Sequence, residues 1–151
     1  MFIKKLSIVF SIILILFTIN INTIYAFNTV TPPPISNEYI KELEIIDNYM
    51  YLLVQSVATK NIDQSKTSKD ITFIETLIDS LTNKTSKLSK EDNDVILSMQ
   101  VILNYYKISI INIKVYIDKN DADRLIDSIT SFSLGYNSSS TLRNTIGKAK
   151  Q

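Results

Sequence analysis

The sequence predicts an all-α protein: a small up-down four-helix bundle that follows an N-terminal signal peptide. Apolar residues recur at alternating three- and four-residue steps through four segments, and short polar stretches join these segments. Glycine occurs only at positions 135 and 147, too rarely for a turn-rich β fold. At 151 residues, the chain is long enough for one domain with a modest core.

Residues 1–26 have the order of charges and apolar residues that is typical of a signal peptide. A short basic start precedes an uncharged apolar run over 6–19, and a more polar stretch ends in Ala26. We expect cleavage between Ala26 and Phe27. The alternative is an uncleaved anchor, since an apolar run extended to Phe27 is just long enough to span a bilayer. Asn20 weighs against the anchor, because it would place an amide at membrane depth.

A Pro-rich linker is expected over residues 27–35. Pro32, Pro33 and Pro34 cannot continue a helix and favour a stiff, extended spacer. A Pro-rich recognition motif is disfavoured, because the stretch lacks the PxxP spacing with a flanking basic residue. The bundle domain is then expected over 36–151.

The first helix is predicted from about Ser36 to about Thr59, with Ser36 or Asn37 as its N-cap. Its apolar stripe comprises Tyr39, Leu43, Ile46, Met50, Leu53 and Val57. Asp47 lies beside this stripe, and Arg124 or Arg143 is its natural partner. The carboxylates of this helix and the next otherwise indicate solvated faces, although paired acids can also serve as acid and base.

The second helix is predicted to follow a polar loop over 61–69, with Thr67 or Ser68 as its cap. Its apolar stripe comprises Ile71, Ile74, Ile78, Leu81 and Leu88, widened by Phe73 and Leu77. The helical spacing of these apolar residues outweighs the modest helix propensity of isoleucine over this many turns.

The third helix is predicted to begin at 89–92, where a serine precedes two acids that suit the positive end of the helix dipole. Its stripe comprises Ile96, Met99, Leu103, Tyr106, Ile110, Ile113 and Ile117, flanked by Val95, Ile102 and Val115. Because it is apolar over more than half its circumference, we expect it to be the central helix. Residues 108–117 would also suit a strand by propensity, but the continuous helical period favours a helix.

The fourth helix is predicted after a turn, with Asn120 or Asp121 as its cap. Its stripe comprises Ala122, Leu125, Ile129, Phe132 and Tyr136. Gly135 and the serine-rich run behind it are expected to loosen the second half, with a short terminal helix at Leu142 and Ile146.

Composition excludes several classes of chemistry. The chain contains no cysteine and no histidine, which excludes disulfides, thiolate or imidazole metal sites, and Ser-His or Cys-His catalysis. It also excludes lipoprotein attachment, which needs a cysteine at the processed N-terminus. The charges are balanced and interspersed, so no basic surface for nucleic acid is expected. No cofactor is indicated.

The turn at 118–123 resembles a calcium loop only superficially. Ala122 occupies the fifth position, Asp123 stands where the loop needs glycine, and Ile129 stands where a bidentate glutamate belongs. Acidic caps at a helix-to-helix turn explain these residues, so no metal site is expected.

The expected function is non-enzymatic binding of a macromolecule by a secreted or surface-associated protein, with another protein or a cell-envelope component as the partner. Tyrosines suit core edges and protein interfaces alike. Tyr105 and Tyr106 are the first candidates for a partner surface, because neighbours on one helix cannot both point inward. A membrane-active protein that retains residues 1–26 is the alternative. An enzyme or small-ligand carrier would need a pocket with buried Asp47, Asn104 or Asn112.

Overall fold

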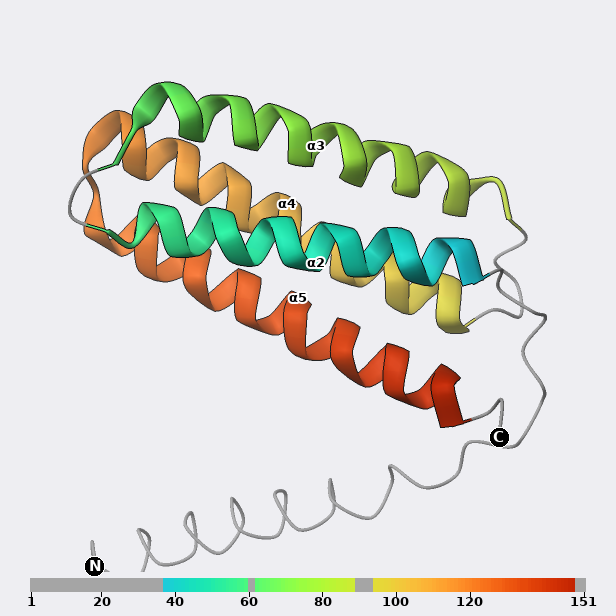
Figure 1. Cartoon of the computed structure of the whole chain (residues 1–151). Helices are drawn as coiled ribbons and strands as arrows, with labels where there is room; N and C mark the ends of the chain where they lie inside the picture. Colours follow the sequence, from blue (N-terminus) through green and yellow to red (C-terminus); the bar gives the residue numbers. More distant parts are fainter. Residues whose placement is uncertain (1–36, 60–61, 89–93, 149–151) are drawn as a thin grey trace, which may run out of the picture. The chain divides into compact units, whose positions relative to one another are not determined.

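The computed structural model describes residues 37–59, 62–88 and 94–148, and this part of the chain is entirely helical, with no strand (Figure 1). The helices are α2 (Asn37–Val57), α3 (Gln64–Ser86), α4 (Asp94–Lys119) and α5 (Ala122–Lys148). The all-α class is therefore confirmed. The predicted signal peptide, the cleavage site at Ala26 and Phe27, the linker and the start of the third helix at 89–92 lie outside the described residues.

The four helices form a ring in chain order. α2 packs against α3 and α5, α4 packs against the same two helices, and α2 and α4 touch only weakly across the diagonal. Figure 1 shows long helices lying side by side, with successive helices running in opposite directions. This arrangement is the predicted up-down bundle.

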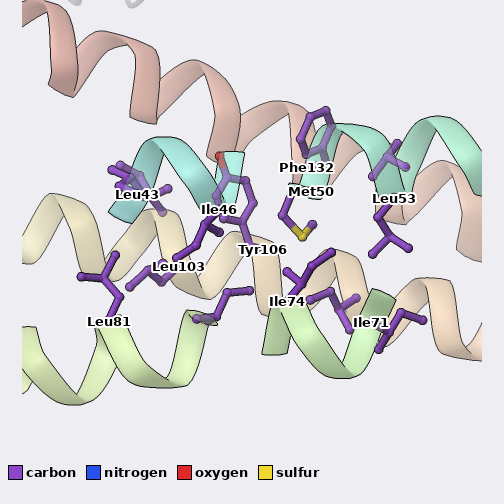
Figure 2. Close-up of a cluster of buried hydrophobic side chains, with 14 of the residues drawn as sticks. Leu43, Ile46, Met50, Leu53, Ile71, Ile74, Leu81, Leu103, Tyr106 and Phe132 are labelled. Carbon is purple, nitrogen blue, oxygen red and sulfur yellow. The ribbon is translucent and has the colours of Figure 1, made fainter. Parts of the chain in front are cut away.

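The core lies along the axis of the bundle, where the predicted stripes of α2, α3 and α4 meet (Figure 2). Its fully buried side chains include Leu43, Ile46, Met50, Ile74, Ile78, Leu81, Met99, Leu103, Ile110 and Ile113. Most are isoleucine, leucine or methionine, whose burial contributes about 1.5–3 kcal/mol each. Hydrophobic packing from three helices therefore supplies the main stabilisation.

The second helix begins earlier than predicted. Asp63 is the N-cap of α3, and its carboxylate accepts a hydrogen bond of 3.0 Å from the amide of Lys66. Thr67, a predicted cap, is instead buried one turn into the helix, and its hydroxyl donates to the carbonyl of Asp63. The loop prediction weighted polarity too heavily, since polar residues also occupy the first turn of a helix.

α4 is one continuous helix, so the strand alternative for 108–117 is wrong. The prediction that α4 is the central helix is also wrong. Its core stripe is buried, but Leu97, Val101, Ile108 and Ile111 are exposed on the opposite side of the helix. These four residues therefore add nothing to the core, whereas Ile102, one of the predicted flanking residues, is fully buried in it.

α5 corrects the fourth prediction. The helix continues without interruption through Gly135 and the serine run to Lys148, so no separate terminal helix exists. Ile129 and Tyr136, two of the predicted stripe residues, are more than a third exposed. The side of α5 that faces the bundle instead comprises Leu125, Ser128, Phe132, Gly135, Ser139 and Leu142.

Small residues on α5 allow α4 to approach closely. Ser109 of α4 and Ser128 of α5 are both fully buried, and their hydroxyls hydrogen-bond at 3.0 Å. A Cβ atom at Gly135 would lie 2.6 Å from Cε1 of Tyr106 and 3.2 Å from the Cβ of Tyr105. Gly135 is therefore required by the close approach of the Tyr106 ring. In the serine run behind it, Ser139 is fully buried and Ser138 is exposed.

Only Asn120 and Asp121 connect α4 to α5. Asn120 has a φ of 52°, in the left-handed region that asparagine tolerates better than most residues. The carboxylate of Asp121 accepts from the amide of Asp123 at 3.0 Å. Asp121 therefore caps α5, as one of the two predicted alternatives.

Candidate functional site

A buried carboxylate links three of the four helices. Asp47 on α2 is fully buried, and Tyr106 on α4 donates its hydroxyl to Oδ1 at 2.5 Å. Two groups from α5 reach Oδ2: the hydroxyl of Ser139 at 2.7 Å and Nη1 of Arg143 at 2.8 Å. In Figure 2, Tyr106 extends from α4 into the core among the side chains of α2. We call Asp47, Tyr106, Ser139 and Arg143 the Asp47 network.

The electrostatics of the Asp47 network follow from burial. Removal from water raises the pKa of Asp47 above its usual range, although Tyr106, Ser139 and Arg143 each lower it in part. Burial also raises the pKa of Tyr106, and the neighbouring carboxylate raises it further. Tyr106 therefore stays a hydroxyl donor at physiological pH, and Arg143 supplies the countercharge.

Of the two predicted partners of Asp47, the structure selects Arg143. Arg124 lies near the start of α5, where Nη1 is 3.4 Å from Asp127 and 3.4 Å from the amide oxygen of Asn112. The two arginines lie far apart along the bundle axis, because both belong to one long helix. Arg143 lies five turns further along the helix than Arg124, at the level of Asp47.

Both carboxylate oxygens of Asp47 have partners within the Asp47 network. A shallow depression of about 520 Å³ lies elsewhere, between α3 and α4. It is lined by Gln64, Ser68, Ile71, Thr72, Lys114, Ile117 and Asp118. Neither Asp47, Asn104 nor Asn112 lines it.

Three further acids of α2 and α3 form ion pairs between helices. Glu42 on α2 pairs with Lys84 on α3. Glu75 and Asp79 on α3 pair with α4, at 2.6 Å to Lys114 and 2.9 Å to Lys107. These pairs are partly exposed, so each contributes little to stability. Over the described residues, no group of three or more acidic side chains could hold a metal ion.

The two residues of the predicted partner surface, Tyr105 and Tyr106, face in different directions. Tyr106 is buried, and its hydroxyl is used by Asp47, so it offers no surface to a partner. Tyr105 is half-buried beside Gly135. Of the predicted pair, only Tyr105 can be reached from outside.

Two apolar surfaces were not predicted from the sequence. The first lies along the groove between α2 and α3, where Tyr49 and Phe73 pack edge to face with ring centroids 5.0 Å apart. Ile45 and Leu52 flank Tyr49 at helical spacing on α2, and all four side chains are 42–56% exposed. We call Ile45, Tyr49, Leu52 and Phe73 the α2–α3 patch. A signal existed, because Ile45 and Leu52 lie off the α2 stripe and have no place in the core.

The second surface is the outward face of α4. Leu97, Val101, Asn104, Ile108, Ile111 and Val115 follow one another at alternating four- and three-residue steps. The four most exposed apolar members are 43–59% exposed. We call these six residues the α4 seam. Its spacing repeats that of the core stripe, displaced to the opposite side of the helix.

α4 is also long and apolar enough to cross a membrane, by length and composition, but half of its most apolar window is buried inside the bundle. A core helix of a folded domain has the same properties. Comparisons with protein-family models, with curated proteins and with solved structures found no match to the chain.

Proposed function

We propose that the chain is exported and that its helical domain binds another protein outside the cytoplasm without catalysing a reaction. The basic, apolar and small-residue order of residues 1–26 supports export. The α2–α3 patch is the observation that carries the binding function. Large apolar side chains that remain exposed and contiguous on a folded domain mark interaction sites.

The chemistry of the α2–α3 patch suits a protein partner. A tyrosine and a phenylalanine in edge-to-face contact offer a rigid aromatic centre, and aromatic residues are enriched in the cores of protein interfaces. Isoleucine and leucine extend this centre along α2. The ion pair between Glu42 and Lys84 lies on the same pair of helices and supplies a polar border. We therefore expect a partner with an apolar surface and a polar rim.

A membrane-active role is the second candidate, and it depends on retention of residues 1–26. Lys107 and Lys114 argue against α4 as a membrane span, because two ammonium groups would lie at membrane depth. In the bundle, both lysines form partly exposed ion pairs with acids of α3, as expected for a helix whose polar side faces water.

Photo-crosslinking in the producing cells tests the binding function. A benzophenone amino acid in place of Phe73 preserves an aromatic ring in the patch, and the same replacement at Ser133, an exposed polar position on α5, is the control. We expect a discrete cross-linked protein from position 73 that disappears when Tyr49→Ser is added. Equal products from both positions would contradict the proposal.

Sequencing the N-terminus of the released protein tests export separately. We expect the mature chain to begin at Phe27. A chain that retains residues 1–26 and fractionates with membranes would favour the membrane-anchored alternative.

A further inference from the structure

The α4 seam has the pattern of a coiled-coil interface. Steps of four and three residues define heptad positions, with Val101, Ile108 and Val115 at position a and Leu97, Asn104 and Ile111 at position d. All three a residues are β-branched, a preference of parallel two-stranded coiled coils. At 1.5 Å per residue, the seam extends over roughly 27 Å of helix. Such a seam stabilises a protein only when another helix covers it.

The borders of the α4 seam carry no unpaired charge that would select an oppositely charged partner. Lys107 and Lys114 are the only charged residues of α4 between Val95 and Ile117, and each pairs with an acid of α3 in the same bundle. On the α5 side, the α4 residues that border the seam are Ser98, Tyr105 and Asn112, which are uncharged. Arg124 of α5 lies 3.4 Å from Asn112, and its charge is paired with Asp127. The best match to a neutral seam is another neutral seam.

Asn104 makes the seam self-complementary. Its side chain is exposed in the middle of an otherwise apolar row, where any apolar partner would leave its amide without a hydrogen-bond partner. An amide both donates and accepts, so a second asparagine satisfies it. In coiled coils, a single asparagine at position a fixes register and oligomeric state, and we expect Asn104 to act in the same way from position d.

We propose that the α4 seam binds the α4 seam of a second copy of this chain, parallel and in register, with the two Asn104 amides facing each other. Antiparallel pairing over the full seam would place Asn104 opposite Ile108 and bury its amide against a hydrocarbon side chain. A lipid surface would leave the amide equally unpaired. The second copy is therefore the occupant that satisfies every position.

The geometry of the bundle leaves this surface accessible. α4 contacts α3 and α5 on its sides and faces α2 only across the diagonal, so the seam points away from the rest of the domain. A specific interface needs about 1,000 Å² of buried surface, which six side chains per copy approach only when the whole seam is paired. We therefore expect a dimer with a dissociation constant in the micromolar range.

The absence of cysteine from the chain allows a direct test by disulfide trapping in the full-length protein. In the parallel dimer, residue 97 of each copy faces residue 97 of the other, so Leu97→Cys should form a disulfide-linked dimer under mild oxidation. Asn48→Cys, on the exposed side of α2, is the control. If Leu97→Cys cross-links no faster than Asn48→Cys, the parallel pairing is wrong.

Sedimentation equilibrium provides the second measurement. The unsubstituted chain should shift from monomer to dimer as its concentration rises through the micromolar range. Ile108→Lys should remain monomeric and still show the helical circular dichroism of the folded bundle, because Ile108 is 46% exposed. A monomeric unsubstituted chain at several hundred micromolar would overturn the proposal.

The proposal does not rest on the α2–α3 patch. Ile108→Lys leaves Tyr49 and Phe73 unchanged, so cross-linking from position 73 reports on the partner protein whether or not the dimer forms. Loss of the position-73 product in a chain that still dimerises would refute only the proposed function.

Discussion

The hydroxyl of Tyr106 donates a hydrogen bond of 2.5 Å to Oδ1 of Asp47, and both side chains are completely buried. This bond joins the diagonal helices α2 and α4, which otherwise make few contacts. Arg143 and Ser139 hold the other carboxylate oxygen from α5. A carboxyl group held from both α4 and α5 favours one relative level of the three helices, because its hydrogen bonds need a defined geometry.

Removal of the carboxylate should be severely destabilising. Asp47→Ala leaves the Arg143 guanidinium and the Tyr106 hydroxyl without their acceptor, a change that costs about 3–5 kcal/mol for a buried ion pair. Glu44→Ala, an exposed acid one turn earlier, should change the free energy of unfolding by less than about 0.5 kcal/mol. Urea denaturation of both variants measures the difference. Comparable losses would show that Asp47 contributes only as an ordinary surface acid.

The stability should also depend on pH through Asp47. Because burial raises the pKa of Asp47 above its ordinary 3.8, the folded state binds a proton more tightly than the unfolded state. This contribution is complete below pH 3.8 and is lost as pH rises through the higher folded pKa. We therefore expect the unsubstituted chain to lose stability relative to Asp47→Asn as the pH rises from 3.8 through the pKa of Asp47 in the folded state. A difference that is constant from pH 4 to pH 7 would contradict the raised pKa.

Gly135→Ala should destabilise the bundle although alanine is the better helix former by about 1 kcal/mol. The added Cβ would lie 2.6 Å from the ring of Tyr106, which cannot move without breaking its bond to Asp47. We expect a net loss of about 1–3 kcal/mol, as for other overpacked cores. Ser133→Ala, an exposed position on α5, is the control and should be neutral or slightly stabilising. Thermal melts followed by circular dichroism distinguish the two.

Aspartate substitutions along α4 test the two faces of this helix. Ile110→Asp and Ile113→Asp bury a carboxylate without a partner and should unfold the domain. Ile111→Asp, at a position 59% exposed, should retain the fold. Lys107→Asp places a second acid beside Asp79 and should lower the free energy of unfolding by about 1 kcal/mol or less. In a strand, Ile111 and Ile113 would share a face, so equal effects at both positions would refute the helix.

The apolar period predicted the first three helices because their core residues are large. Ile46, Ile78 and Ile110 lie in stripes whose spacing admits only a helix, and all three are buried. The same reasoning failed for α5, where the buried positions 128, 135 and 139 hold serine or glycine. A prediction based on large apolar side chains misses a helix–helix interface in which small residues allow close packing.

The candidate surfaces were harder to predict. The acid at position 47 was correctly singled out as needing an arginine, because it adjoins an apolar stripe. Which arginine it contacts depends on how far α5 extends, and that was misjudged at Gly135. The α4 seam was visible in the sequence as additional apolar residues, but period alone cannot tell whether a second stripe enters the core or faces solvent.

The Asp47 network also bears on the order in which the helices can pack during synthesis. Ser139 follows Asp47 by 92 residues, and Arg143 lies further still toward the C-terminus. α2 therefore leaves the ribosome before the groups of α5 that neutralise its buried acid. Closing α2 onto α3 and α4 before α5 is made would bury a carboxylate without its arginine, which is unfavourable. We therefore expect the bundle to close only after position 143 has been synthesised.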